Sequence, residues 1–217
     1  MTLIIKTSLI NVITWGFKLL YHQFAWMYNF AAWLVSAGRW NDWVRETGRF
    51  ATKSPLLDIG CGQGVLLEQA ARNTITAYGL DESPQMLRRS QKRLPPTAGY
   101  LIRGVGQAMP FAGGSFQTIT ATFPAPYLFE LTTLNEIRRV LASDGRVIIL
   151  LAAVVTGSSL HEYVLRSFGK FFGFAPLSET ILQRFLHPLH QAGFDSVLNI
   201  KETNHSKLFF ILARLDN

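Results

Sequence analysis

The chain has 217 residues, which suits one domain or two small ones, and 48% of them are hydrophobic, which excludes intrinsic disorder. Charged residues make up only 16% of the chain, and its formal net charge of +7 permits an anionic partner without establishing one. A single cysteine excludes a disulfide framework and a cysteine-built zinc site, and it favours a reducing compartment.

The first forty residues are unusually apolar. No Asp, Glu, Lys or Arg occurs in 19–38, and apolar residues recur at helical spacing from Ile13 to Leu34. Polar residues within the stretch argue against a membrane-spanning helix and against a signal peptide. We therefore predict a helical segment over 1–50 that packs on the main domain, covers a hydrophobic substrate as a lid, or contacts a membrane surface, followed by the main domain over 51–217.

Short apolar runs alternate with helical patterns from residue 55 onward, which predicts a parallel sheet with right-handed crossovers. The predicted strands cover 56–59, 75–80, 100–103, 116–123 and, after a turn at Asp144-Gly145, 146–155. The predicted helices cover 65–72, 83–94, 131–141, 162–174 and 178–191. Strands over 195–202 and 207–215 are joined by a short connection, so we expect an antiparallel hairpin at this end of the chain.

Three glycines follow the first predicted strand in the run Asp58-Ile59-Gly60-Cys61-Gly62-Gln63-Gly64. Glycines at such a turn let the main chain approach a ligand, and the helix that follows supplies free N–H groups. A dinucleotide fingerprint, G-x-G-x-x-G, needs a glycine where Val65 or Leu67 stands, so a nicotinamide oxidoreductase is disfavoured. Asp58 would repel a pyrophosphate and would attract an ammonium group.

A second carboxylate, Asp81, ends the second predicted strand. An acid at this position can accept hydrogen bonds from both ribose hydroxyls of a nucleoside. Two acids at neighbouring strand ends suit a nucleoside that carries a positively charged amino-acid tail and no phosphate. S-adenosylmethionine combines ribose, ammonium and sulfonium groups, so it is the predicted cofactor.

Four segments resemble the class I S-adenosylmethionine-dependent methyltransferases, especially the small-molecule branch that includes ubiquinone and menaquinone biosynthesis C-methyltransferases. These segments are LLDIGCGQG (56–64), YGLDESPQML (78–87), GQAMPFAGGSFQTITATFP (106–124) and LNEIRRVLASDGRVIIL (134–150). The resemblance implies an α/β, Rossmann-like, doubly wound sheet of seven strands, parallel except for the last strand, in a three-layer αβα arrangement. The apolar N-terminal helical extension is added to that fold.

The resemblance also implies roles for individual residues. The loop glycines would form the turn under the methionine part of the cofactor, Asp58 would hold its amino group and Asp81 its ribose. Glu82 would lie against adenine, and Thr122 and Phe123 would lie where the methionine end meets the substrate. The full predicted set of cofactor-binding residues is Asp58, Gly60, Cys61, Gly62, Gly64, Asp81, Glu82, Gly106, Gln107, Thr122 and Phe123.

Two positions depart from the family pattern. Gly104-Val105-Gly106 stands where the family commonly has Gly-Asp-Ala, and Ser115-Phe116-Gln117 replaces Ser-Phe-Asp. In the family, the aspartate of the first motif meets the adenine amino group. Its absence predicts either weaker adenine recognition or a replacement hydrogen bond from Glu82 or Gln107.

Methyl transfer from a sulfonium requires alignment of the reacting atoms and exclusion of water more than it requires acid–base chemistry. Tyr28 and Tyr127 are candidates for cation–π contact with the sulfonium, and core packing is the alternative for both. His161 is a candidate general base if the acceptor arrives protonated. No metal site is predicted.

The predicted function is therefore S-adenosylmethionine-dependent methyl transfer to a small hydrophobic acceptor, such as a quinone precursor, a phenol or a lipid-like molecule. The alternative is a protein of the same fold with little catalysis that serves as a membrane-surface or partner-binding module. We expect a cytoplasmic protein with a candidate peripheral membrane contact through residues 1–40. No nucleic-acid partner is expected, and the sequence leaves the oligomeric state open.

Overall fold

The computed structural model describes residues 36, 38–96, 99–156 and 183–216. The chain divides into two compact units, 1–40 and 41–217, and the account that follows concerns the second. Of the helical segment predicted over 1–50, the structure describes only residues 36 and 38–50, which include a helix at Trp40–Gly48. The helix predicted over 162–174 and the first part of the one predicted over 178–191 lie outside the described residues. The domain boundary after residue 50 stays a prediction. Within the described ranges, no helix is long and apolar enough to cross a membrane.

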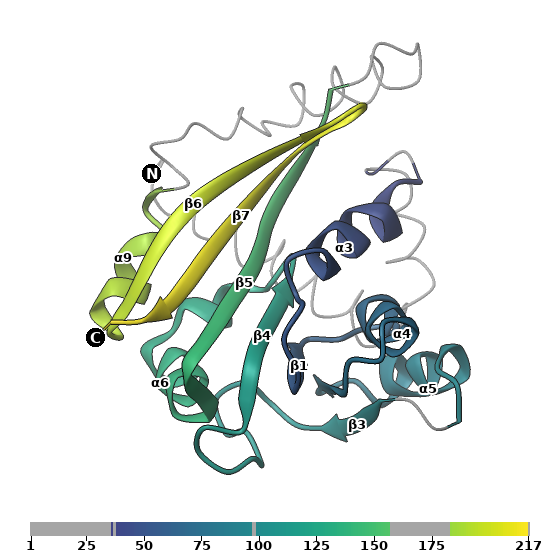
Figure 1. Cartoon of the computed structure of the whole chain (residues 1–217), viewed down its shortest axis with the longest axis horizontal. Coiled ribbons are helices and arrows are strands. Elements are labelled where there is room, and N and C mark those ends of the chain that lie inside the picture. Colours follow the sequence, from purple (N-terminus) through teal and green to yellow (C-terminus); the bar gives the residue numbers. More distant parts are fainter. Residues whose placement is uncertain (1–35, 37, 97–98, 157–182, 217) are drawn as a thin grey trace, which may run out of the picture. The chain divides into compact units, whose positions relative to one another are not determined.

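Strands and helices alternate along most of the second unit (Figure 1). In chain order the elements are α3 (Trp40–Gly48), β1 (Leu56–Ile59), α4 (Val65–Arg72), β2 (Ala77–Asp81), α5 (Pro84–Arg93), β3 (Tyr100–Arg103), β4 (Phe116–Thr122), the 3-10 helix η1 (Pro126–Phe129), α6 (Leu131–Val140), β5 (Leu141–Val155), α9 (Leu186–Gln191), β6 (Phe194–Thr203) and β7 (Ser206–Leu215).

The strands form one seven-stranded sheet in the order β3-β2-β1-β4-β5-β7-β6. β1 pairs in parallel with β2 and β4, β2 pairs in parallel with β3, and β4 pairs in parallel with β5. β7 is antiparallel to both of its neighbours, β5 and β6. The predicted doubly wound sheet with a reversed last strand is therefore confirmed, and the hairpin accounts for the reversal.

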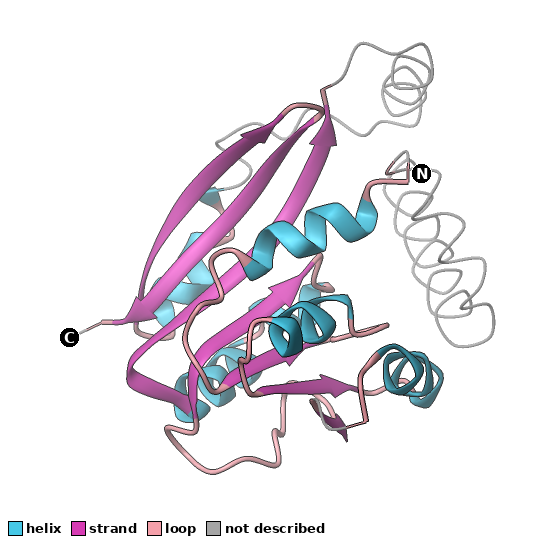
Figure 2. Ribbon diagram, turned by 45° about the vertical axis from the view of Figure 1, so that its right-hand side comes forward, coloured by secondary structure: helices cyan, strands magenta, loops and turns pink. Residues whose placement is uncertain are grey.

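Helices cover both faces of this sheet (Figure 2). α4 and α5 contact each other on one side, and α6 and α9 contact each other on the other. Side chains alternate between faces along a strand, so Leu57 and Ile59 join the core cluster formed with Leu134 and Ile137 of α6, while Asp58 between them points to the opposite face. This alternation puts the acid on the side of α4.

The start of β5 differs from the prediction. The sequence predicts a turn at Asp144-Gly145 and a strand that begins at Arg146, whereas β5 begins at Leu141. The register with β4 shifts between Phe116↔Leu141 and Thr118↔Arg146, so the intervening residues of β5 form an irregular extension of the strand. Asp144 is held there because its Oδ1 accepts a 2.9 Å hydrogen bond from Gln117 Nε2.

α3 packs against the antiparallel part of the sheet. Trp43 is buried, and its Nε1 donates a 2.9 Å hydrogen bond to Ser206 Oγ at the start of β7. Just after the helix, the ring of Phe50 lies 4.9 Å from that of Phe210 on the same strand. These contacts fix α3 next to the end of the sheet at which β4 and β5 place their last residues.

Candidate functional site

The candidate site lies at the carboxyl ends of β1 and β2, where parallel strands of an open α/β sheet commonly bind ligands. The loop that follows β1 is tied to the end of β2, because the N–H groups of Gly60 and Cys61 both donate to Leu80 O, at 2.7 Å and 3.1 Å. Gly60, Gly62 and Gly64 have φ angles of +69°, +53° and +73°. Other residues rarely adopt such angles, so the glycine spacing is a backbone requirement of this loop.

Asp81 fixes the middle of the glycine loop. Its side chain is only 3% exposed, and its Oδ2 accepts a 2.9 Å hydrogen bond from the N–H of Gly62. Its Oδ1 accepts a 2.8 Å hydrogen bond from the N–H of Ser83, which is also the N-cap of α5. Burial raises the pKa of Asp81, although these two N–H groups partly lower it. Each oxygen keeps a further lone pair for a ligand hydroxyl.

Asp58 lies on β1, one residue before the end of the strand, and its register partner on β2 is Gly79. It is 2% exposed, and its Oδ1 accepts a 2.8 Å hydrogen bond from the hydroxyl of Thr120, its register partner on β4. Burial raises the pKa of Asp58 to about 7, the Thr120 hydrogen bond opposes part of that rise, and the charge of Asp81 adds to it. The two acids are thus close enough to interact, and a cation between them would favour their ionised forms.

Cys61 fills space rather than serving as a nucleophile. A Cβ atom at Gly79 of β2 would lie 2.7 Å from Cys61 Sγ, so the thiol occupies the room that this glycine leaves. Burial, together with Asp58 and Asp81, holds the pKa of the Cys61 thiol well above its usual range. In the part of the chain that the structure describes, no group of three His, Cys, Asp or Glu side chains could hold a metal ion.

Tyr127 of η1 reaches the same site from beyond β4. A Cβ atom at Gly60 would lie 3.7 Å from the Tyr127 hydroxyl, and one at Gly106 would lie 3.1 Å from Cε2 of its ring. Burial raises the pKa of Tyr127 to about 12, and the charges of Asp81, Glu82 and Asp58 add to that rise. The phenol is neutral near pH 7, and the negative charges of these three acids act on it.

The remaining predicted residues lie at the rim of the site. Glu82 and Gln107 are exposed, and the backbone carbonyl of Glu82 accepts a 3.2 Å hydrogen bond from Arg103 Nε. Val105, where the family has an acid, is 42% exposed. Gly106 is buried under Tyr127.

The end of β4 places an aromatic side chain near the site. Thr122 is the last residue of the strand, and Phe123 follows with a φ of +48° while its N–H donates to Leu150 O at 2.8 Å. The Phe123 ring lies 6.0 Å from the ring of Trp43. Trp43 was not among the predicted site residues, and its position in an amphipathic stretch gave no sign of this contact.

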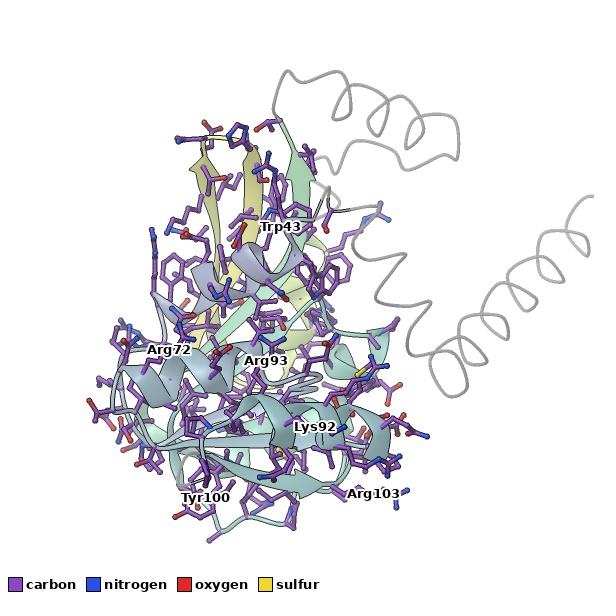
Figure 3. All side chains as sticks on the ribbon, turned by 90° about the vertical axis from the view of Figure 1, so that its right-hand side faces the viewer. Trp43, Arg72, Lys92, Arg93, Tyr100 and Arg103 are labelled. Atoms are coloured by element: carbon purple, nitrogen blue, oxygen red, sulfur yellow. The ribbon has the colours of Figure 1, made fainter. Side chains whose placement is uncertain are left out.

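Three basic residues of α5 and β3, Arg88, Lys92 and Arg103, are exposed. Arg93 and Arg72 both donate to Glu68 of α4, at 3.1 Å and 2.6 Å. Figure 3 shows Lys92 and Arg103 on the side of α5 and β3, far from Trp43 on α3. The candidates Tyr28 and His161 lie outside the described residues, so their roles stay predictions.

Comparison with known proteins agrees with this geometry. Residues 57–149 match the family described as methyltransferase domain, and these residues run from β1 into β5. The chain resembles the class I S-adenosylmethionine-dependent methyltransferases. A ubiquinone/menaquinone biosynthesis C-methyltransferase from Geotalea uraniireducens is 32% identical over 134 residues, 57% of this chain and 57% of that protein. The chain thus spans little more than half the length of that relative.

Two further methyltransferases support the resemblance. A demethylmenaquinone methyltransferase from Bacillus velezensis is 28% identical over 149 residues, which cover 62% of this chain and 64% of that protein. The crystal structure of magnesium protoporphyrin IX methyltransferase from Synechocystis PCC 6803, which has S-adenosylhomocysteine bound, aligns with a TM-score of 0.51 at 16% identity, over 80% of this chain and 83% of that one. At that identity the structural match shows the fold alone.

Proposed function

We propose that this protein binds S-adenosylmethionine at the carboxyl ends of β1 and β2 and transfers its methyl group to a small hydrophobic acceptor. The observation that carries the proposal is the glycine loop whose central N–H is held by a buried carboxylate of the next strand. Three glycines with positive φ leave the main chain bare at this turn. The methyltransferase-domain match over the same residues supports the choice of cofactor.

The residues present fit a cationic nucleoside better than a phosphorylated one. Both Asp58 and Asp81 are buried at the strand ends, and a pyrophosphate brought beside them would be repelled by their negative charges. An ammonium group would be attracted, and it would lower the raised pKa of Asp58. Ribose hydroxyls could donate to the lone pairs of Asp81 that Gly62 and Ser83 leave free.

The chemistry assigned to the chain's own residues is positioning. S-adenosylmethionine would supply a methyl group on a sulfonium, which leaves as a neutral thioether when an in-line nucleophile takes the methyl group. Thr122 and Phe123, at the end of β4, would border the methionine end and the acceptor. The Phe123–Trp43 pair provides an apolar aromatic wall there, which would help exclude water from an apolar acceptor.

The acceptor proposed is a quinone precursor, a phenol or a lipid-like molecule. Support comes from the apolar composition of the chain, from this aromatic wall, and from the quinone-pathway names of two curated relatives. A comparison of aromatic and aliphatic acceptors with radiolabelled S-adenosylmethionine would test it. Transfer of label only to polar amines or to protein would reject the acceptor class and leave the cofactor intact.

Calorimetry tests the cofactor directly. We expect S-adenosylhomocysteine to bind the full chain and NADH to give no heat of binding. An Asp81→Asn variant should bind S-adenosylhomocysteine about tenfold more weakly, because one acceptor oxygen becomes a donor that cannot bond both a ribose hydroxyl and an N–H group. Preferential binding of NADH would overturn the proposal. Binding without any methyl transfer would favour the alternative of a partner-binding module.

A peripheral membrane contact through residues 1–40 is proposed on the sequence alone, because those residues are apolar and residues 1–54 carry more basic than acidic side chains. The full chain should pellet with vesicles of anionic phospholipid and should remain in solution with vesicles of neutral phospholipid. Equal behaviour with both vesicle types would count against an electrostatic component of the contact.

A further inference from the structure

Tyr127 has an unusual place among the side chains around the site. η1 carries it past the end of β4, and its ring lies between two loops that follow β1 and β3. Its Cε2 would be 3.1 Å from a Cβ atom at Gly106, and its hydroxyl oxygen would be 3.7 Å from a Cβ atom at Gly60. The strand that ends in Asp81 lies between β1 and β3 in the sheet, so the phenol spans the ligand-facing edge on both sides of that acid.

The glycine at position 106 is what admits the ring. A side chain there would meet both the Tyr127 ring and Cγ2 of Thr133, the latter at 3.0 Å, which is closer than nearly all real Cβ contacts. Tyr127 and Gly106 therefore fit each other as a pair.

The Tyr127 hydroxyl lies beside the glycine loop that follows β1. Among the described residues, no hydrogen bond involves the Tyr127 hydroxyl, and the negative charges of Asp81, Glu82 and Asp58 act on it. The phenol is protonated at neutral pH, so it can both donate and accept a hydrogen bond. Thr133 beside it is fully buried, and its Oγ1 also lacks a partner within the described part of the chain.

We propose that Tyr127 is a cofactor-contacting residue that recognises the nucleoside, with its ring packed against it and its hydroxyl bonded to it across the Asp81 edge. This inference rests on the proposed function, because the nucleoside it recognises is the one that the glycine loop and Asp81 would hold. Tyr127 thereby supplies, from beyond β4, a neutral polar contact at a site otherwise lined by carboxylates. Such a contact favours an uncharged heterocycle or sugar hydroxyl, whereas the flanking acids disfavour a phosphate.

Binding of S-adenosylhomocysteine to the full chain, measured by calorimetry, tests this role. We expect Tyr127→Ala to weaken binding about tenfold, because ring contact and hydrogen bond are both lost, and Tyr127→Phe to weaken it about threefold, because only the hydrogen bond is lost. Phe129→Ala is the matched control: Phe129 lies on the same short helix but packs on Phe185, at 5.0 Å between ring centres. It should change affinity less than twofold, and unchanged circular dichroism would show that each variant is folded.

A variant of Gly106 tests whether the position of the Tyr127 ring determines the affinity. Gly106→Ala should displace the Tyr127 ring and weaken binding in the native chain, but should add little to the effect of Tyr127→Ala when the two are combined. Equal affinity of Tyr127→Ala and the native chain would overturn the inference and leave the proposed function standing. Tighter binding by Tyr127→Ala would overturn it as well, since the ring would then obstruct the site. Absence of binding by the native chain would overturn both proposals.

Discussion

The two halves of the sheet are built differently. β3, β2, β1 and β4 have 4, 5, 4 and 7 residues, and glycines and acids gather where β1, β2 and β3 end. β5, β7 and β6 have 15, 10 and 10 residues and pair largely through antiparallel ladders. The candidate site therefore lies where strands stop early and leave bare loops, while the long strands bury apolar side chains.

The two halves also differ in the kind of side chain that they bury. The short-strand half holds both buried acids, Asp58 and Asp81, whose pKa values are raised by burial. On β7, by contrast, Leu208, Phe210 and Ile211 are completely buried and apolar. Stability in the long-strand half should therefore depend on how well the buried apolar side chains fill the core. In the short-strand half it should depend on the charge of the buried acids and on backbone conformation.

The largest effect is expected in the long-strand half. Phe210→Ala should lower the free energy of unfolding by about 4 kcal/mol, because it leaves a cavity in the core and removes the ring contact with Phe50. Urea denaturation would measure the loss. Affinity for S-adenosylhomocysteine should change little in the protein that remains folded. A large loss of affinity would show that the two halves are coupled more tightly than their construction suggests.

The ionisation of Asp58 should make the free energy of unfolding depend on pH. The folded-state pKa of Asp58, about 7, exceeds its ordinary value of 3.8, so the folded chain holds the proton more tightly and its stability falls as the pH rises from about 4 to 8. Asp58→Asn, which cannot ionise, should be more stable than the native chain by about 4 kcal/mol at pH 8 and should show no advantage at pH 4. Denaturation curves across this range would measure the difference. A constant difference would mean that Asp58 does not titrate there.

The next prediction compares the loss of stability caused by alanine at two glycines with left-handed backbone conformations. Gly64 and Gly193 have similar φ angles of +73° and +78°. A Cβ atom at Gly64 would collide with Ser90 Oγ and lie 3.3 Å from Ser90 Cα, whereas one at Gly193 would meet only the movable end of Arg138. We expect Gly64→Ala to cost about 3 kcal/mol and Gly193→Ala about 1 kcal/mol of unfolding free energy. Equal thermal shifts of the two variants would contradict the role given to Ser90.

The smallest effect concerns α3, which joins the long-strand half to the end of β4. Trp43→Phe keeps an aromatic ring near Phe123 but removes the hydrogen bond to Ser206, so it should cost about 1 kcal/mol of unfolding free energy. Ser206→Ala is the matched change from the other side, and the double variant should lose little more than either single one. Additive losses would show that the two side chains act independently.

Sequence periodicity predicted most of the fold, because the strand and helix patterns of the βαβ units are local. The reversal of β7 also followed locally, from the short connection between two strands. The start of β5 did not, since Asp144-Gly145 suits a turn and its bonding partners, Gln117 and Lys53, lie far away along the chain. Pairings of that kind depend on tertiary structure.

The site was predictable to a similar degree. Spacing predicted that Asp58, Asp81 and the loop glycines come together, and the structure places them at the neighbouring ends of β1 and β2. Thr120 was missed, although parallel pairing of β1 with β4 would have placed it opposite Asp58. The fit of Tyr127 over Gly106 could not be predicted, because it depends on how far η1 extends beyond the sheet.

The position of β7 has a consequence for synthesis of the chain. β6 is made before β7, yet it joins the sheet only through β7, which lies between it and β5. Until the segment 206–215 has been synthesised, the edge of β5 that will pair with β7 has no neighbouring strand. β6 then has no strand with which to pair. A nascent chain halted shortly before that point would expose an open strand to other proteins, which makes this the step at which a chaperone would matter most.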